Sequence, residues 1–198
     1  MTELDEAVTE AVERAAESRL NSIVAVLVAI AATCMALGNV KDGNVTQAMG
    51  QAQARMVDAW SYYQAKGTKE NVAQATLDEL IALEAALPAK AFDRAGITRR
   101  IADYRDQVAK YAKEKDAIKA EAEGYQRQYD GLNQHDDQFD LSEASFSVAI
   151  ALLGVTALTQ KRWLLGFATA FLGIGLLFGL AGFFGWSIHP DAIMSWLS

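Results

Sequence analysis

The sequence predicts an all-α membrane protein with three transmembrane helices. A long antiparallel helical hairpin, similar to a coiled coil, is expected between the first and second of them. Two observations lead to this fold class. Uncharged apolar runs near both ends of the chain approach the roughly 20 residues that a bilayer span needs. The polar middle of the chain carries a sustained heptad repeat, which indicates helices that pack along a seam.

Composition narrows the classes of function. The chain has 198 residues and a net charge of −7, so it lacks the electrostatic basis for nucleic-acid binding. Its single cysteine, Cys34, excludes an internal disulfide and a cysteine metal cluster. We therefore expect no nucleic-acid partner and no cofactor.

Residues 1–19 predict an acidic amphipathic helix, and residues 20–38 predict the first transmembrane helix. The segment LNSIVAVLVAIAATCMAL carries no charge. A cleaved signal peptide is the competing interpretation, but the region before the apolar run is long and acidic and lacks a good cleavage signal. We expect an uncleaved span in which Cys34 is a structural thiol.

The stretch from Asn39 to Lys66 predicts the start of the extramembrane hairpin, residues 44–140. Asp42-Gly43-Asn44 is a turn signal, and Asn44 with Gln47 has the spacing of a capping box. Apolar residues then follow at heptad spacing, which predicts a seam formed by Met49, Ala52, Met56, Ala59 and Tyr63.

The same stretch resembles a bacterial membrane family known as domain of unknown function 4337. The likeness is carried by NVKDGN, QAMGQAQA and WSYYQAK between Asn39 and Lys69, and extends more loosely to the terminal apolar segments. The resemblance implies a three-span bacterial membrane protein. It implies no activity and no catalytic residue.

The returning arm of the hairpin has the clearest periodicity. Pro88 ends the first arm, and alternating steps of four and three residues then define a second seam. Its positions are Ile97, Ile101, Tyr104, Val108, Tyr111, Lys115, Ile118, Ala122, Tyr125, Tyr129 and Leu132. On the first arm, the register is expected to break near Gly67. A fold at Gly67 that yields a shorter three-helix bundle is the alternative to one hairpin.

Residues 141–160 and 163–186 predict the second and third transmembrane helices, and residues 187–198 a short tail. Trp163 and Trp186 bracket the third span, as expected for side chains at a membrane interface. Gly175 and Gly179 form a GxxxG pattern that allows close helix contact.

The chain offers little for catalysis. His135, Asp136, Asp137 and Asp140 form the one weak candidate for a divalent-metal site, and a solvated acidic joint is the simpler interpretation. Glu143, at the start of the second span, is the only charged residue in the three predicted spans, and the absence of charge deeper in the spans disfavours an ion-coupled transporter. We expect no enzyme activity and no dedicated metal site.

The sequence instead favours an integral membrane scaffold or interaction protein that forms homo-oligomers. The self-association candidates are Gly175, Gly179, Met49, Met56, Tyr104 and Tyr111. An oligomeric pore, with one span of each copy lining an axis, is the alternative. The expected partners are membrane lipid, further copies of the chain and an unidentified protein.

Charges near the spans predict the topology. Arg14, Arg19, Lys161 and Arg162 lie on one side, whereas Lys41 lies close to a span on the other. The positive-inside rule therefore predicts that the N-terminus lies in the cytoplasm, and that the hairpin stalk of residues 44–140 lies in the periplasm, of a bacterial inner membrane.

Overall fold

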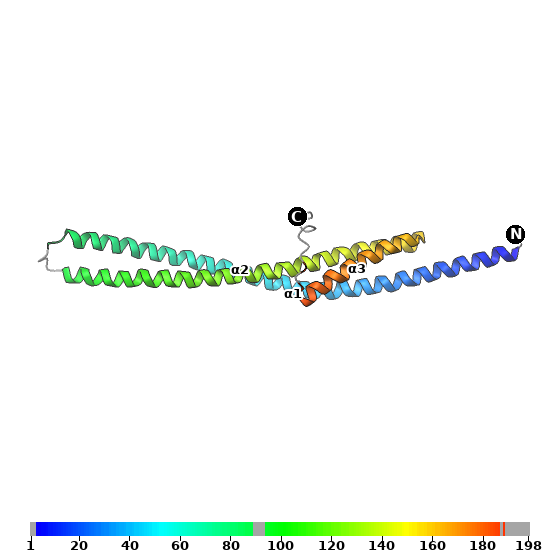
Figure 1. Cartoon of the computed structure of the whole chain (residues 1–198), viewed down its shortest axis with the longest axis horizontal. Coiled ribbons are helices and arrows are strands. Elements are labelled where there is room, and N and C mark those ends of the chain that lie inside the picture. Colours follow the sequence, from blue (N-terminus) through cyan, green and yellow to red (C-terminus); the bar gives the residue numbers. More distant parts are fainter. Residues whose placement is uncertain (1–2, 89–93, 187, 189–198) are drawn as a thin grey trace. The chain divides into compact units, whose positions relative to one another are not determined.

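The chain folds into three long helices (Figure 1). The structure, a computed structural model, describes residues 3–88, 94–186 and 188. Helix α1 spans Glu3–Ala86, α2 spans Arg94–Thr159 and α3 spans Arg162–Phe184. The described residues contain no strand, so the predicted all-α class is confirmed.

Each helix contains a segment that is long and apolar enough to cross a membrane. The most apolar windows of α1, α2 and α3 have mean hydropathies of 2.3, 1.7 and 2.2. The prediction of three such segments is therefore confirmed by length and composition.

The helices contribute to two compact units. The first unit comprises Met1–Ala48 and Gly131–Ser198, and the second comprises Met49–Asp130. The second unit is thus shorter at both ends than the segment 44–140 expected from the sequence. The two predicted sequence boundaries, near residues 38–44 and 140, fall inside α1 and α2.

Small side chains let the three helices of the first unit pack closely. Ala31 of α1, Ala149 of α2 and Ala168 of α3 are completely buried. The core around them is completed by Val24, Phe146, Leu153 and Leu172. Alanine at the contact points allows backbones to approach, and the larger side chains fill the space between them.

Glycines of α3 bring that helix even closer to α2. A Cβ at Gly175 would lie 3.0 Å from the Phe146 ring, and one at Gly182 would lie 2.9 Å from the Phe139 ring. A Cβ at Gly179 would lie 2.9 Å from Ser142 Oγ. This face of α3 therefore packs on α2 of the same chain.

In the second unit, the predicted seams are confirmed as the buried surface. Every predicted position on α2, from Ile97 to Tyr129 in this unit and at Leu132 just beyond it, is buried or half-buried. Ala59 of α1 packs with Ile118 and Ala122 of α2. The 3-4 spacing on α1 places the contact residues on one face, as a heptad repeat requires.

Charged residues in the seam are paired between the two helices. Lys66 of α1 forms an ion pair with Glu114 of α2, and Glu70 of α1 forms one with Lys115 of α2. Thr98 of α2 donates a hydrogen bond to Glu84 of α1. The expectation that the first arm breaks register near Gly67 is wrong, because Lys66, Glu70 and Glu84 remain on the buried stripe and have partners there.

The turn predicted at Asp42-Gly43-Asn44, with Asn44 as a helix cap, is also wrong. Helix α1 continues through these residues and through Gly67. Val45 and Met49 are both buried, so a turn before them would remove two contact residues from the stripe. Tertiary packing of this kind outweighs the cost of about 1 kcal/mol for a glycine inside a helix.

Replacing Gly179 with leucine should destabilise the contact between α2 and α3. The new side chain would overlap Ser142, and overpacking of this kind costs about 1–3 kcal/mol. Gly154→Leu is the matched control, since a Cβ there meets nothing within 4 Å. Thermal unfolding in detergent should show a lower midpoint for Gly179→Leu only. Equal midpoints for the two variants would contradict the packing.

Candidate functional site

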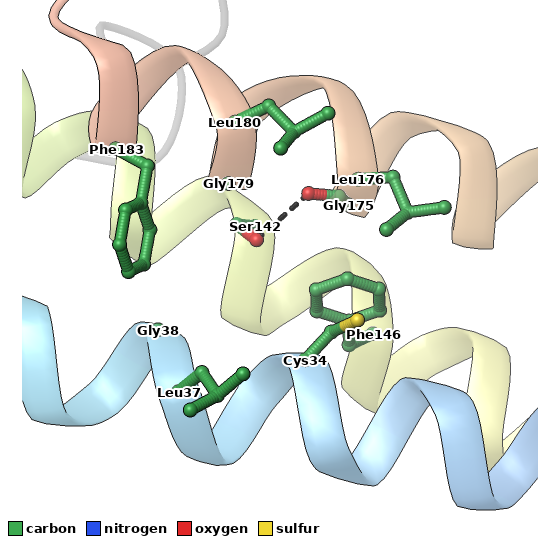
Figure 2. Close-up of a pocket in the computed structure, with 10 residues that line it drawn as sticks. All are labelled: Cys34, Leu37, Gly38, Ser142, Phe146, Gly175, Leu176, Gly179, Leu180 and Phe183. Atoms are coloured by element: carbon green, nitrogen blue, oxygen red, sulfur yellow. Dashed lines mark hydrogen bonds between the residues drawn. The ribbon is translucent and has the colours of Figure 1, made fainter.

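An apolar pocket lies among the three helices of the first unit (Figure 2). Its volume is about 140 Å³. Its lining residues are Cys34, Leu37 and Gly38 of α1, Ser142 and Phe146 of α2, and Gly175, Leu176, Gly179, Leu180 and Phe183 of α3. Glycines on α1 and α3 leave the space that larger side chains would otherwise fill.

The pocket is open at the surface of the unit. Leu37 is 60% exposed, and Leu180 and Phe183 are 45% and 50% exposed. Figure 2 shows the Phe183 and Leu176 side chains extending from α3 toward α1, while Cys34 extends from α1 toward α2. Cys34 is half-buried, so the single thiol of the chain faces a cavity instead of a closed core.

The one hydroxyl in the lining is already used. Ser142 Oγ donates a hydrogen bond of 2.8 Å to the carbonyl oxygen of Gly175. This bond ties α2 to α3 at the point where Gly179 allows close approach. The remaining lining is hydrocarbon, ring and thiol, so the pocket suits an apolar group.

Acidic side chains gather next to the pocket, with Asp42 one turn after Gly38 on α1 and Asp136 and Asp140 before Ser142 on α2. Thr46 Oγ1 of α1 donates a hydrogen bond of 3.0 Å to Asp136 of α2. Asp42 has a buried carboxylate oxygen without a hydrogen-bond partner. Burial, together with the charges of Asp136, Asp140 and Glu143, raises the pKa of Asp42 to about 6. Burial and the neighbouring carboxylates Asp136, Asp137 and Glu143 also raise the pKa of Asp140.

Gln138, which is completely buried, holds the segment after α3. Its Nε2 donates hydrogen bonds of 2.8 Å to the carbonyl oxygens of both Trp186 and Ile188. The Oε1 of Gln138 lies 3.4 Å from His135 Nδ1. Gln138, Ser142 and Asp42 were not predicted as site residues from the sequence. Neither Gln138 nor Ser142 continues the alternating spacing that ends at Leu132, so that spacing offered no signal for them.

The weak metal candidates have separate partners in the structure. Asp136 accepts a hydrogen bond from Thr46, and Asp137 accepts one of 3.4 Å from Asn133. His135 lies beside Gln138. In the part of the chain that the structure describes, no three His, Cys, Asp or Glu side chains are arranged to hold a metal ion. Asp140 instead contributes negative charge to the acidic group near Asp42.

The self-association candidates all have positions within the fold of one chain. Gly175 and Gly179 face α2. On the seams, Met49 is buried, and Met56, Tyr104 and Tyr111 are half-buried. Lys66 Nζ lies 5.4 Å from the centre of the Tyr111 ring, close enough for a cation–π contact. Their role between copies stays a prediction, and the contacts observed are within the chain.

Comparison with known proteins identifies the family. A model described as Domain of unknown function (DUF4337) matches residues 20–185. The chain belongs to this family. No curated protein and no solved structure matches it.

The region matched by the DUF4337 model contains both features of the site. It includes every residue that lines the apolar pocket, and the acidic residues Asp42, Asp136 and Asp140. The N-terminal part of α1, before residue 20, lies outside it. In this DUF4337 chain the candidate site is therefore built entirely from the family region.

Replacing Asp42 with asparagine should stabilise the protein more at pH 7.5 than at pH 4.5. The folded-state pKa of Asp42 lies above its ordinary value of 3.8, so the folded protein holds a proton that the unfolded chain releases between about pH 4 and 6. Its contribution to stability is thus greatest at low pH and is lost as the pH rises through about 6.

Thermal unfolding in detergent at the two pH values measures the effect. The exposed residue Asp58 provides the control variant Asp58→Asn, for which we expect the same small change at both pH values. The assignment fails when Asp42→Asn shifts the midpoint equally at pH 4.5 and pH 7.5.

Proposed function

We propose that the chain is a multi-pass integral protein of the bacterial inner membrane that acts as a homo-oligomeric scaffold or interaction protein. The observation that carries membrane insertion is the exposed apolar surface of the first unit. Its large apolar side chains that are 40% or more exposed include Val26, Ile30, Val148, Val155, Phe167, Ile174, Leu177 and Phe184. Such a surface is costly in water and is satisfied by lipid.

The two ends of α3 also support insertion of this helix across a bilayer. Trp163 and Trp186 are 62% and 46% exposed and lie at opposite ends of this helix. Tryptophan is enriched at membrane interfaces because its ring is apolar and its N–H is polar. Helix α3 has 23 residues, about 35 Å of helix at 1.5 Å per residue, which matches a bilayer span.

We infer that the second unit is an antiparallel hairpin. Its contacts support this arrangement, because residues later in α1 pair with residues earlier in α2. Glu84 accepts from Thr98, Glu70 pairs with Lys115, and Ala59 packs with Ile118. Each arm would extend about 55 Å, which offers a long surface to a partner.

Exposed apolar residues on this unit support a role in interaction. Val57, Tyr62 and Val72 are 53%, 53% and 62% exposed, and they lie off the buried stripe. They are available to a further copy or to a protein partner, whereas the stripe is already covered within the chain.

A different face of α3 is suited to contact between copies. Gly166, Ala170 and Gly173 are exposed, and a Cβ at either glycine meets nothing within 4 Å. Helices in lipid associate through small residues that allow close van der Waals packing. This face adds a second small-residue surface to Gly175 and Gly179, where a Cβ would meet α2 of the same chain.

The double variant Gly166→Leu with Gly173→Leu should reduce the number of protomers in each assembly. Light scattering, corrected for detergent, should give a mass of several protomers for the native chain of 21.5 kDa and a smaller mass for the variant. Gly154→Leu should assemble like the native chain. A single-protomer mass for the native chain over a wide concentration range would refute the homo-oligomer, and a water-filled axis through the particle would favour a pore.

The proposed topology places the N-terminus in the cytoplasm and the second unit in the periplasm. Arg14, Arg19, Lys161 and Arg162 support this orientation. In a Cys34→Ser background, a Gly131→Cys variant should react with a membrane-impermeant maleimide in intact spheroplasts, because Gly131 is exposed. Labelling only after lysis, with a positive control on a known periplasmic protein, would reverse the orientation.

A further inference from the structure

The pocket between the three helices is an apolar space that the side chains of the chain leave open. It adjoins the exposed apolar surface of the first unit through Leu37, Leu180 and Phe183. We propose that it binds one acyl chain of a phospholipid whose headgroup carries a phosphate and a primary amine, as in phosphatidylethanolamine. This inference rests on the proposed insertion in a membrane.

The volume and the lining fit a short piece of an acyl chain. An apolar cavity of about 150 Å³ takes up a ligand the size of benzene, so about 140 Å³ suits about six carbon atoms. The hydroxyl of Ser142 already donates a hydrogen bond to the carbonyl oxygen of Gly175, so the ligand need not supply an acceptor for it. Because the pocket opens among exposed apolar side chains, the rest of the lipid chain can continue along that surface.

The pocket has a polar end, which gives the lipid a direction. Gly38, Ser142 and Phe183 line this end. The neighbouring residues of α1 and α2 carry the charges, at Lys41 and Asp42 on α1 and at Asp140 on α2. Lys41 follows Leu37 by four residues and Gly38 by three, so it lies on the same side of α1 and is exposed. Its ammonium group is suited to the phosphate of a headgroup.

The acidic residues favour a headgroup that carries a primary amine as well as the phosphate. Asp42 of α1 and Asp140 of α2 lie at the same end, and burial together with the neighbouring carboxylates raises the pKa of each. A primary ammonium group would neutralise part of this charge and donate hydrogen bonds to it. A glycerol headgroup carries no such cation, and the quaternary ammonium of choline has no N–H to donate.

Native mass spectrometry of the delipidated full chain tests the proposal. Phosphatidylethanolamine, phosphatidylglycerol and phosphatidylcholine with the same acyl chains are added in turn. We expect one retained phosphatidylethanolamine per chain and weaker retention of the other two. Lys41→Gln should weaken retention about tenfold, since a charge-assisted hydrogen bond of this kind is worth roughly that factor. Equal retention of all three lipids would overturn the proposal.

Gly38→Phe should block the pocket. A Cβ at Gly38 meets nothing within 4 Å, so the ring enters the open space without displacing a helix. Gly154→Phe is the matched control on α2, away from the lining, and should retain the lipid as the native chain does. Retention by Gly38→Phe equal to that of the native chain would place the lipid elsewhere and overturn the proposal.

The single cysteine gives a second measurement that needs no variant. Cys34 lines the pocket, so phosphatidylethanolamine should slow its reaction with N-ethylmaleimide more than phosphatidylcholine does. The same rate with both lipids would count against occupancy of the pocket.

Flotation of the protein with liposomes separates the proposed membrane insertion from the proposed lipid site. A chain that floats without protecting Cys34 keeps the proposed membrane insertion and refutes only the lipid site.

Discussion

The close approach of α3 to α2 determines the architecture of the first unit. Gly175, Gly179 and Gly182 present backbone where other residues would present a Cβ, and Phe146, Ser142 and Phe139 occupy the space that this leaves. Two of these glycines, Gly175 and Gly179, also line the pocket on the side of α1, where they contribute no side-chain volume. Tight packing and the cavity therefore have one cause.

The second unit depends on a different balance, because its seam contains charged residues. The hydrogen bond to Glu114 raises the pKa of Lys66, and the hydrogen bond to Glu70 raises the pKa of Lys115. The charged form of each lysine is thus favoured where the helices meet. An unpaired charge at such a position would be costly, so these pairs favour the observed register over a register shifted by one heptad.

Elements that depend on periodicity and hydropathy could be predicted from the sequence. Features whose structure is determined by contacts between distant residues could not. The seam from Ile97 to Leu132 was visible as regular spacing, and the three apolar segments as composition. The turn signal at Asp42-Gly43-Asn44 was misleading because Val45 and Met49, which follow it, are buried by tertiary packing that local propensity does not report. The GxxxG pattern correctly indicated close contact, but its partner within the chain, Phe146 and Ser142, appears only in the fold.

The polar end of the pocket follows from how α3 ends. Gly185 adopts a left-handed conformation with φ of 69°, and the N–H of Trp186 bonds back to the carbonyl of Ala181. This terminates the helix in the manner of a Schellman motif, and Gln138 then satisfies the carbonyls of Trp186 and Ile188. The chain is therefore fixed to α2 at the level where Asp42 and Asp140 crowd together. The site therefore has an apolar part, the pocket, and a polar part at the level of Asp42 and Asp140. A phospholipid is divided in the same way, between its acyl chains and its headgroup.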